Sequence, residues 1–135
     1  MTLENLVKIH QLKKEPADKH EFEGLVKASI DRLKDSQFES LSFASRFDLA
    51  YSAAHGLALA ALRASGHRSD KRYIVFLCLA HTTNLSKTQI RIFSRCHEKR
   101  NLAEYEGHFE TDEQILAELI THTKSLLKCV NEIKF

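Results

Sequence analysis

The segment Ser40–Ser65, SLSFASRFDLAYSAAHGLALAALRAS, carries the clearest helical pattern in the chain. Its apolar residues recur at alternating steps of four and three, the spacing that buries one side of a helix in a bundle. These residues are Phe43, Phe47, Ala50, Ala54, Leu57 and Ala61. Further alanines surround this seam, so that neighbouring helices can approach it closely on several sides. We therefore predict a central helix here, ended by Gly66.

Two helical segments are expected before the central helix. Residues 1–15 carry apolar side chains near the spacing of one helical face, which predicts a short N-terminal helix and a linker. Pro16 interrupts the pattern, because the residue before a proline disfavours helix. Asp18 followed by Glu21 has the spacing of a capping box, which opens a second helix that runs to about Ser36.

After the central helix, residues 71–83 fit either a helix or a strand on periodicity, since Tyr73–Phe76 is β-prone. No second strand is available to pair with that run, so we predict helix. Four Gly and one Pro also fit long helices better than a turn-rich β protein. The predicted fold class is all-α: an up-and-down antiparallel bundle of five or six helices, with residues 1–135 forming one domain.

Capping patterns mark the last two helices. Ser86 and Gln89 are spaced as a capping box in front of the next-to-last helix, and Gly107 is placed to end that helix. Thr111 with Gln114 repeats the capping pattern, which predicts the start of the final helix.

Bulk composition indicates a cytoplasmic protein without membrane association. Three cysteines without paired spacing argue against a disulfide framework and for a reducing compartment. The longest apolar run, Ile74–Ala80, is far shorter than the roughly 20 residues that a membrane-spanning helix needs. Glu4 stands where a signal peptide would carry its apolar core. The formal net charge of +2 is too mild to imply nucleic-acid binding by itself.

The distribution of charge is more informative than its total. Cations at four-residue intervals form a basic ridge along the predicted helix 87–105, and they repel one another slightly. The basic ridge consists of Lys87, Arg91, Arg95 and Lys99. An external counter-charge such as nucleic-acid phosphate would offset this repulsion. The alternative is a solvated face that the acidic residues between 104 and 118 neutralise, and charge alone favours this alternative.

Polar groups crowd the end of the same helix. The guanidinium of Arg100 suits bidentate contact with phosphate. Asn101 and Tyr105 lie four residues apart and share a helix face, with Arg100 beside that face. Without further information the commoner arrangement is structural, with Arg100 in a local ion pair with Glu104 and Tyr105 packed as a half-buried cap.

These residues give the chain a resemblance to the HEPN family, the helical domains of higher eukaryote and prokaryote nucleotide-binding proteins. HEPN domains carry an arginine and a polar residue, with four to six positions before a histidine. Arg100-Asn101-x-x-x-Tyr105 is similar to that motif, with Tyr105 in place of the histidine. The segments Phe47–His55 and Ala61–Arg68 also resemble the alanine-rich helix and the exit of a bacterial branch of the family. The likeness extends from Leu6 to Val130.

The resemblance implies a four- or five-helix bundle, commonly homodimeric, with the arginine motifs of both protomers near a shared cleft. Catalytic members of the family are metal-independent endoribonucleases. Their arginine would hold the scissile phosphate, and their histidine would transfer protons. A tyrosine is a poor substitute for that histidine, because the ordinary pKa of its phenol is about 10. The resemblance therefore implies phosphate binding with weak or lost nuclease activity.

The predicted site follows from this resemblance. The candidate catalytic residues are Arg100 and Tyr105, and the candidate phosphate- or RNA-binding residues are Arg95, Lys99, Arg100 and Asn101. We expect RNA or a nucleotide as ligand, a second copy of the chain and an antitoxin protein as partners, and no cofactor. The predicted function is an RNA- or nucleotide-binding component of a toxin–antitoxin or defence system. The alternative is a non-catalytic module that docks its basic helix on an acidic partner, such as a nucleotidyltransferase-type antitoxin.

Metal binding is not predicted. A zinc site would need to gather Cys78 and His81 with Cys96 and His67, but no second close-spaced pair of ligands supports it. His108, eight residues after Arg100, falls outside the spacing of the HEPN motif.

Overall fold

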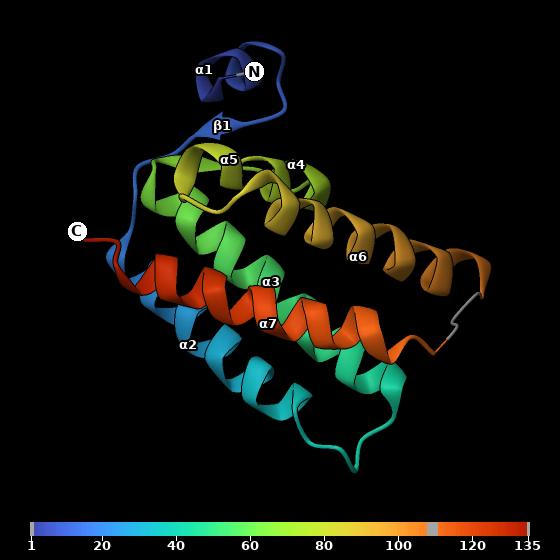
Figure 1. Cartoon of the computed structure of the whole chain (residues 1–135). Helices are drawn as coiled ribbons and strands as arrows, with labels where there is room; N and C mark the ends of the chain where they lie inside the picture. Colours follow the sequence, from blue (N-terminus) through green and yellow to red (C-terminus); the bar gives the residue numbers. More distant parts are fainter. Residues whose placement is uncertain (1, 108–110, 135) are drawn as a thin grey trace.

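The computed structural model describes residues 2–107 and 111–134, and over these residues the chain forms an all-α bundle (Figure 1), as predicted. The described helices are α1 (Leu3–Lys8), α2 (Lys19–Ser36), α3 (Phe43–Ala64), α4 (Arg72–Leu77), α5 (Leu79–Thr82), α6 (Lys87–Glu106) and α7 (Glu113–Asn131). Two short strands accompany them, β1 (Lys13–Lys14) and β2 (His67–Arg68). None of the described helices is long and apolar enough to cross a membrane.

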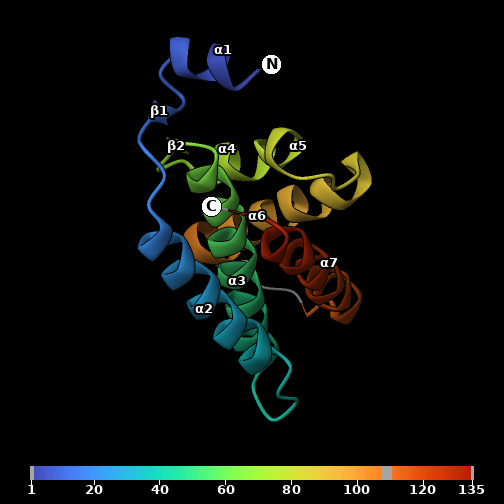
Figure 2. The same ribbon diagram turned by 90° about the vertical axis from the view of Figure 1, so that its left-hand side faces the viewer.

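Helix α3 lies at the centre of the bundle, as its alanine-rich seam predicts. Helices α2 and α7 flank α3, and α6 crosses on the side of α4 and α5 (Figures 1 and 2). The predicted seam is buried from Phe47 to Ala61, while Phe43 at its start is half-buried. Ser42 caps the helix by accepting a hydrogen bond from the backbone N–H of Ser45 at 3.1 Å. The buried seam joins side chains from α2, α4, α6 and α7 in one apolar core.

Close approach of α2 to α3 depends on small side chains. Gly56 of α3 faces Ser29 of α2, and a Cβ at position 56 would overlap the Ser29 hydroxyl. A side chain at position 56 would therefore require the Ser29 hydroxyl to rotate away from its present place.

The N-terminal segment is tied to the end of α3 in a way that the sequence did not predict. Strands β1 and β2 pair antiparallel, with Lys13 opposite Arg68, and the backbone N–H of Glu15 donates to the carbonyl of Gly66 at 2.9 Å. The predicted helix over the first residues is correspondingly shorter and ends at Lys8. Gly66, with a φ of +84°, allows the reversal that brings β2 against β1.

Arg63, the last arginine of α3, fixes this connection. Its side chain is only 2% exposed and donates hydrogen bonds to the carbonyls of Glu15 at 2.9 Å and Pro16 at 2.7 Å. It also pairs with the carboxylates of Glu15 and Glu21, and Arg68 pairs with the same two carboxylates. The linker around Pro16 is thereby held against the C-terminal end of α3.

Within residues 71–83, Arg72–Leu77 and Leu79–Thr82 are helical, which confirms the choice of helix over strand for Tyr73–Phe76. The segment forms two short helices, α4 and α5, that meet at Cys78. The capping box in front of α6 is also confirmed: Ser86 and Gln89 exchange hydrogen bonds of 2.9 and 3.2 Å. Gly107, in the left-handed conformation, ends α6 as expected.

Two capping predictions require correction. Asp18 accepts from the backbone N–H of Glu21 at 3.1 Å, but the Glu21 side chain pairs with Arg63 of α3 and Arg68 of β2 instead of completing the box. The cap of α7 is Asp112, not Thr111, and its carboxylate accepts from the N–H of Ile115 at 3.1 Å. An aspartate is the stronger acceptor of two adjacent residues that both suit an N-cap.

A candidate anion-binding cleft between α3 and α6

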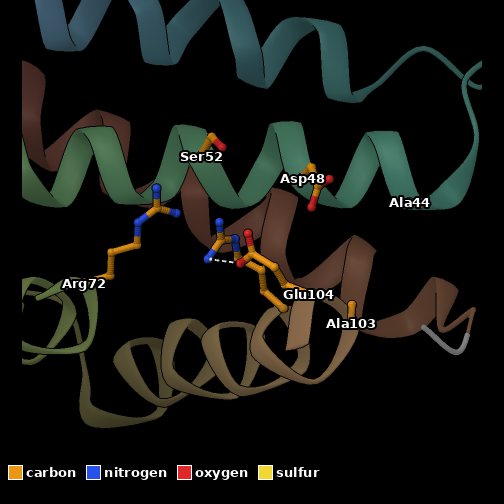
Figure 3. A pocket seen from close by; sticks show the side chains of 7 residues that line it. Ala44, Asp48, Ser52, Arg72, Ala103 and Glu104 are labelled. Atoms are coloured by element: carbon orange, nitrogen blue, oxygen red, sulfur yellow. Dashed lines mark ion pairs between the residues drawn. The ribbon is translucent and has the colours of Figure 1, made fainter. Parts of the chain in front are cut away.

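A cleft of about 390 Å³ lies between α3 and α6. Three residues of α3 at four-residue intervals form one wall, Arg72 enters from α4, and the last turns of α6 form the other wall (Figure 3). The lining residues are Ala44, Asp48, Ser52, Arg72, Arg100, Ala103 and Glu104. Only small or short side chains face the cleft from α3, which leaves space for a ligand of modest size.

Two guanidinium groups from different helices share one aromatic ring. The Cζ atom of Arg72 lies 5.6 Å, and that of Arg100 5.2 Å, from the ring centroid of Tyr51. Tyr51 is completely buried, so its ring is a fixed surface on which both guanidiniums rest. The ring positions two cations on one cleft although they are far apart in sequence.

The two arginines differ in their partners. Arg100 forms an ion pair with Glu104 one turn later, with 3.0 Å between Nη1 and Oε2. Arg72 has no carboxylate within ion-pair distance in the described part of the chain. A half-buried guanidinium without such a partner can accept a ligand anion without first giving up an ion pair.

Asp48 contributes a second carboxylate to the cleft. Burial raises its pKa, the charge of Arg100 opposes that rise, and the negative charge of Glu104 adds to it. With both carboxylates ionised, Asp48 and Glu104 balance the formal charges of Arg72 and Arg100.

A chain of polar groups holds the hydroxyl of Tyr51 in place. Its hydroxyl lies 2.8 Å from Nδ1 of His97, and Nε2 of His97 lies 3.2 Å from the side-chain nitrogen of Asn101. Burial lowers the pKa of His97, and the charges of Arg100 and Arg72 lower it further, so the imidazole is neutral near pH 7. A neutral imidazole has one N–H and one acceptor nitrogen, so it donates on one side and accepts on the other.

His55 shows the same positive environment. Its ring packs edge-on against Phe76, with the centroids 5.9 Å apart. Burial lowers the pKa of His55 to about 4, and the charges of Arg72, Arg100 and His97 contribute. Two histidines beside the paired arginines are thus held in their uncharged form, which leaves positive charge to the guanidiniums.

No known protein family matches this sequence, and a comparison with curated proteins finds no match either. What the cleft binds is therefore inferred from the chemistry of its own residues.

Of the predicted site residues, Arg100 lines the cleft. Asn101 does not line it, and its side chain contacts His97, whose other ring nitrogen meets the Tyr51 hydroxyl. The ring of Tyr105 is 78% exposed, neither half-buried as a cap nor among the residues that line the cleft. Lys99 and Arg95 lie elsewhere on α6, half-buried and exposed respectively, and do not line the cleft either.

Several residues of the cleft were not predicted from the sequence, above all Arg72 and the Tyr51 ring. One local signal was present: Asp48 and Ser52 interrupt an otherwise apolar helix at the spacing of one face, together with Ala44. Such a polar stripe within a buried helix indicates a site or a solvent-filled gap.

No group of three or more His, Cys, Asp or Glu side chains is placed to hold a metal ion within the described ranges. Cys78 and Cys96 are both buried free thiols, and burial raises their pKa to about 11 and about 12. They are therefore protonated near neutral pH. His108 lies outside the described residues.

Proposed function

We propose that this protein binds the phosphate of an RNA or a nucleotide in the cleft between α3 and α6, and that Arg100 and Arg72 contact this phosphate. The observation that supports the proposal is the convergence of two guanidiniums on the Tyr51 ring at the edge of one cleft. Guanidinium groups bind phosphate through paired, charge-assisted hydrogen bonds, which are stronger than neutral ones.

The wider role that we propose is that of an HEPN-like, cytoplasmic component of a toxin–antitoxin or defence system, acting as a homodimer. The Arg100-Asn101-x-x-x-Tyr105 motif and the alanine-rich central helix support this role through their resemblance to that family. The position of Arg100 in a cleft agrees with the phosphate-holding role that the resemblance implies.

Within that role we favour binding over cleavage, with metal-independent endoribonuclease activity weak or lost. A phenol such as that of Tyr105 is a poor proton-transfer group near neutral pH, and this one stands outside the cleft. Both ring nitrogens of His97 already contact Tyr51 and Asn101, so this histidine serves better as a support than as a general base.

Fluorescence titration with a labelled adenine nucleotide and with a short single-stranded RNA tests the proposal. Arg100→Ala and Arg72→Ala should each weaken binding by about tenfold or more, since a charged hydrogen bond contributes about 1.5–3 kcal/mol. Arg32→Ala, which removes an exposed cation from α2, is the matched control and should leave affinity within about twofold. Equal affinities for the wild type and all three variants, or no binding at low salt, would refute the proposal that the cleft binds phosphate.

A second candidate function is supported by the basic ridge of α6. Lys87, Arg91 and Arg95 are exposed, and none of the ion pairs within the described residues involves them. The ridge could instead dock on an acidic protein, such as a nucleotidyltransferase-type antitoxin, without catalysis.

Salt dependence separates the two functions. Binding of single-stranded RNA should weaken with salt with a logarithmic slope of about −0.7 per phosphate contact. If Arg91→Glu abolishes binding to an acidic partner while no RNA affinity is measurable at low salt, the docking function is correct and the phosphate function is not.

A further inference from the structure

We propose that the cleft selects a phosphomonoester, such as a nucleoside monophosphate or the phosphorylated end of an RNA, over a phosphodiester, and that Asp48 makes this distinction. The inference rests on the proposed phosphate-binding function, because it specifies which kind of phosphate the same cleft takes. It goes further in assigning a role to an acidic residue, which phosphate binding alone does not explain.

The two arginines have more hydrogen-bond donors than the two terminal oxygens of a phosphodiester can accept. Arg72 and Arg100 come from different helices and line one cleft, so they approach a bound anion from two directions. Each guanidinium can make two parallel hydrogen bonds to oxygens. A phosphomonoester has three terminal oxygens, whereas a phosphodiester has two, since its other two oxygens carry carbon.

Glu104 is the anion that a ligand has to replace. It already occupies Arg100 at 3.0 Å, and it is 47% exposed, so it can turn towards solvent when a stronger anion arrives. A phosphomonoester that has kept one proton carries the same single negative charge as the Glu104 carboxylate and as a phosphodiester, so displacement of Glu104 opens the site to both esters and does not separate them.

Asp48 adds the discriminating contact. Its side chain points from α3 towards α6, into the space that the arginines border (Figure 3). A phosphodiester presents only acceptor oxygens to this carboxylate, so the two would repel one another. A phosphomonoester can keep one proton, because its second pKa is about 6, and the resulting P–OH can donate to Asp48. The raised pKa of Asp48 itself favours such proton sharing.

The residues that line the cleft differ between its two ends. Arg72 stands at one end of the cleft, and the small residues Ala44 of α3 and Ala103 of α6 lie towards the other end (Figure 3). A terminal phosphate can reach the arginines with the rest of its molecule lying between the alanines. The volume of about 390 Å³ is within the range of pockets that hold a small organic ligand.

Calorimetric titration with a matched pair of ligands tests the inference. AMP and 3′,5′-cyclic AMP share the nucleoside and differ in having a monoester or a diester phosphate. We expect the wild-type protein to bind AMP at least about tenfold more tightly, a difference that corresponds to about 1.4 kcal/mol. A hexanucleotide RNA with and without a 5′-phosphate then shows whether the monoester is taken free or at an RNA end, and tighter binding of the phosphorylated strand identifies the latter source.

Asp48→Asn should reduce the preference for AMP over cyclic AMP to threefold or less by raising the affinity for cyclic AMP, since an amide can donate a hydrogen bond to the diester. Asp35→Asn, which removes an exposed carboxylate from α2, should keep the wild-type preference. Glu104→Gln should tighten the binding of both ligands, because it removes the anion that competes for Arg100.

Equal wild-type affinity for AMP and cyclic AMP would overturn the selectivity while leaving phosphate binding intact. An unchanged preference in Asp48→Asn would overturn the role of Asp48. Absence of binding by either nucleotide and by either RNA would instead overturn the proposed function on which the inference rests.

Discussion

Replacement of Arg63 by methionine tests the tie between the N-terminal linker and α3. Met has a similar length but cannot donate a hydrogen bond, so Arg63→Met removes the charge and keeps most of the volume. The change deprives the carbonyls of Glu15 and Pro16 of their donor and leaves the Glu21 carboxylate with Arg68 alone.

The expected loss of stability is about 3 kcal/mol. Breaking a fully buried ion pair from one side costs about 3–5 kcal/mol. The lower end applies here, because the side chains of Glu15 and Glu21 are 45% and 33% exposed and can be solvated after the change. With an unfolding entropy of about 2.1 cal/mol/K per residue, this loss corresponds to a decrease in Tm of about 10 °C.

Urea unfolding followed by circular dichroism measures the effect, with Arg32→Met on the exposed face of α2 as the control. The control should change the free energy of unfolding by less than about 0.5 kcal/mol. A loss below about 1 kcal/mol in Arg63→Met would refute the view that Arg63 holds the linker in place.

The pH dependence provides a second check on the same residue. The hydrogen bond from Arg63, opposed by burial and reinforced by Arg68, lowers the pKa of Glu21 below its ordinary value of 4.5. A carboxyl with a depressed pKa contributes stability above its unfolded pKa and loses it as the pH falls through the folded value. The difference between wild type and Arg63→Met should therefore be constant above about pH 5 and narrow below pH 4.5.

Three further experiments probe the core and the cleft. Gly56→Ala should destabilise the protein by about 1–3 kcal/mol in urea unfolding, because the added methyl group overlaps the buried Ser29 hydroxyl and forces it to move. Gly24→Ala, on an open helix surface, should instead stabilise the protein by up to about 1 kcal/mol. Since the pKa of His55 is lowered from its ordinary 6.5 to about 4 in the folded protein, the wild type should lose stability as the pH falls from 6.5 to about 4, and His55→Gln should flatten that part of the curve. Tyr51→Phe keeps the ring beneath both guanidiniums and should leave the affinity for AMP within about threefold, while the imidazole NMR signals of His97 shift. Tyr51→Leu removes the ring and should weaken AMP binding by about tenfold. Equal effects of the two variants on AMP affinity would contradict the role of the ring.

The helical part of the fold could be predicted because its signals are local. The seam of α3 depends on residues three and four apart, and the Ser86–Gln89 box depends on a spacing of three. The short β1–β2 pair could not be predicted, since each strand has two residues and neither has a pattern of its own. Its partners meet only because Gly66 reverses the chain and Arg63 holds the linker, and both effects act across about fifty residues.

The cleft likewise has one part that could be predicted from local sequence and one part that depends on contacts between distant segments. Arg100 was predicted as a site residue because it lies in a short polar segment whose members are close in sequence. Its neighbour Asn101 contacts His97 one turn earlier, which is also a local relation. The position of Arg72 beside Arg100 follows only from the packing of α4 against the centre of α3, where Tyr51 is buried. Nothing in the sequence around Arg72 distinguishes it from other surface cations.

The two groups of arginines in this bundle show what separates a structural cation from one that can bind a ligand. Arg63 uses its donors on backbone carbonyls and on two carboxylates, and it is sealed from solvent, so it has no capacity for another anion. Arg72 lies against an aromatic ring, borders an open cleft, and has no carboxylate partner in the described part of the chain. Both segments that resemble HEPN proteins contain arginines, yet the exit segment Ala61–Arg68 stabilises the fold, and the segment that begins at Arg100 borders the cleft. Hydrogen-bonding capacity that the protein itself leaves unused, more than charge or burial alone, is therefore the reason why the proposed phosphate site is placed at Arg72 and Arg100 and not at Arg63.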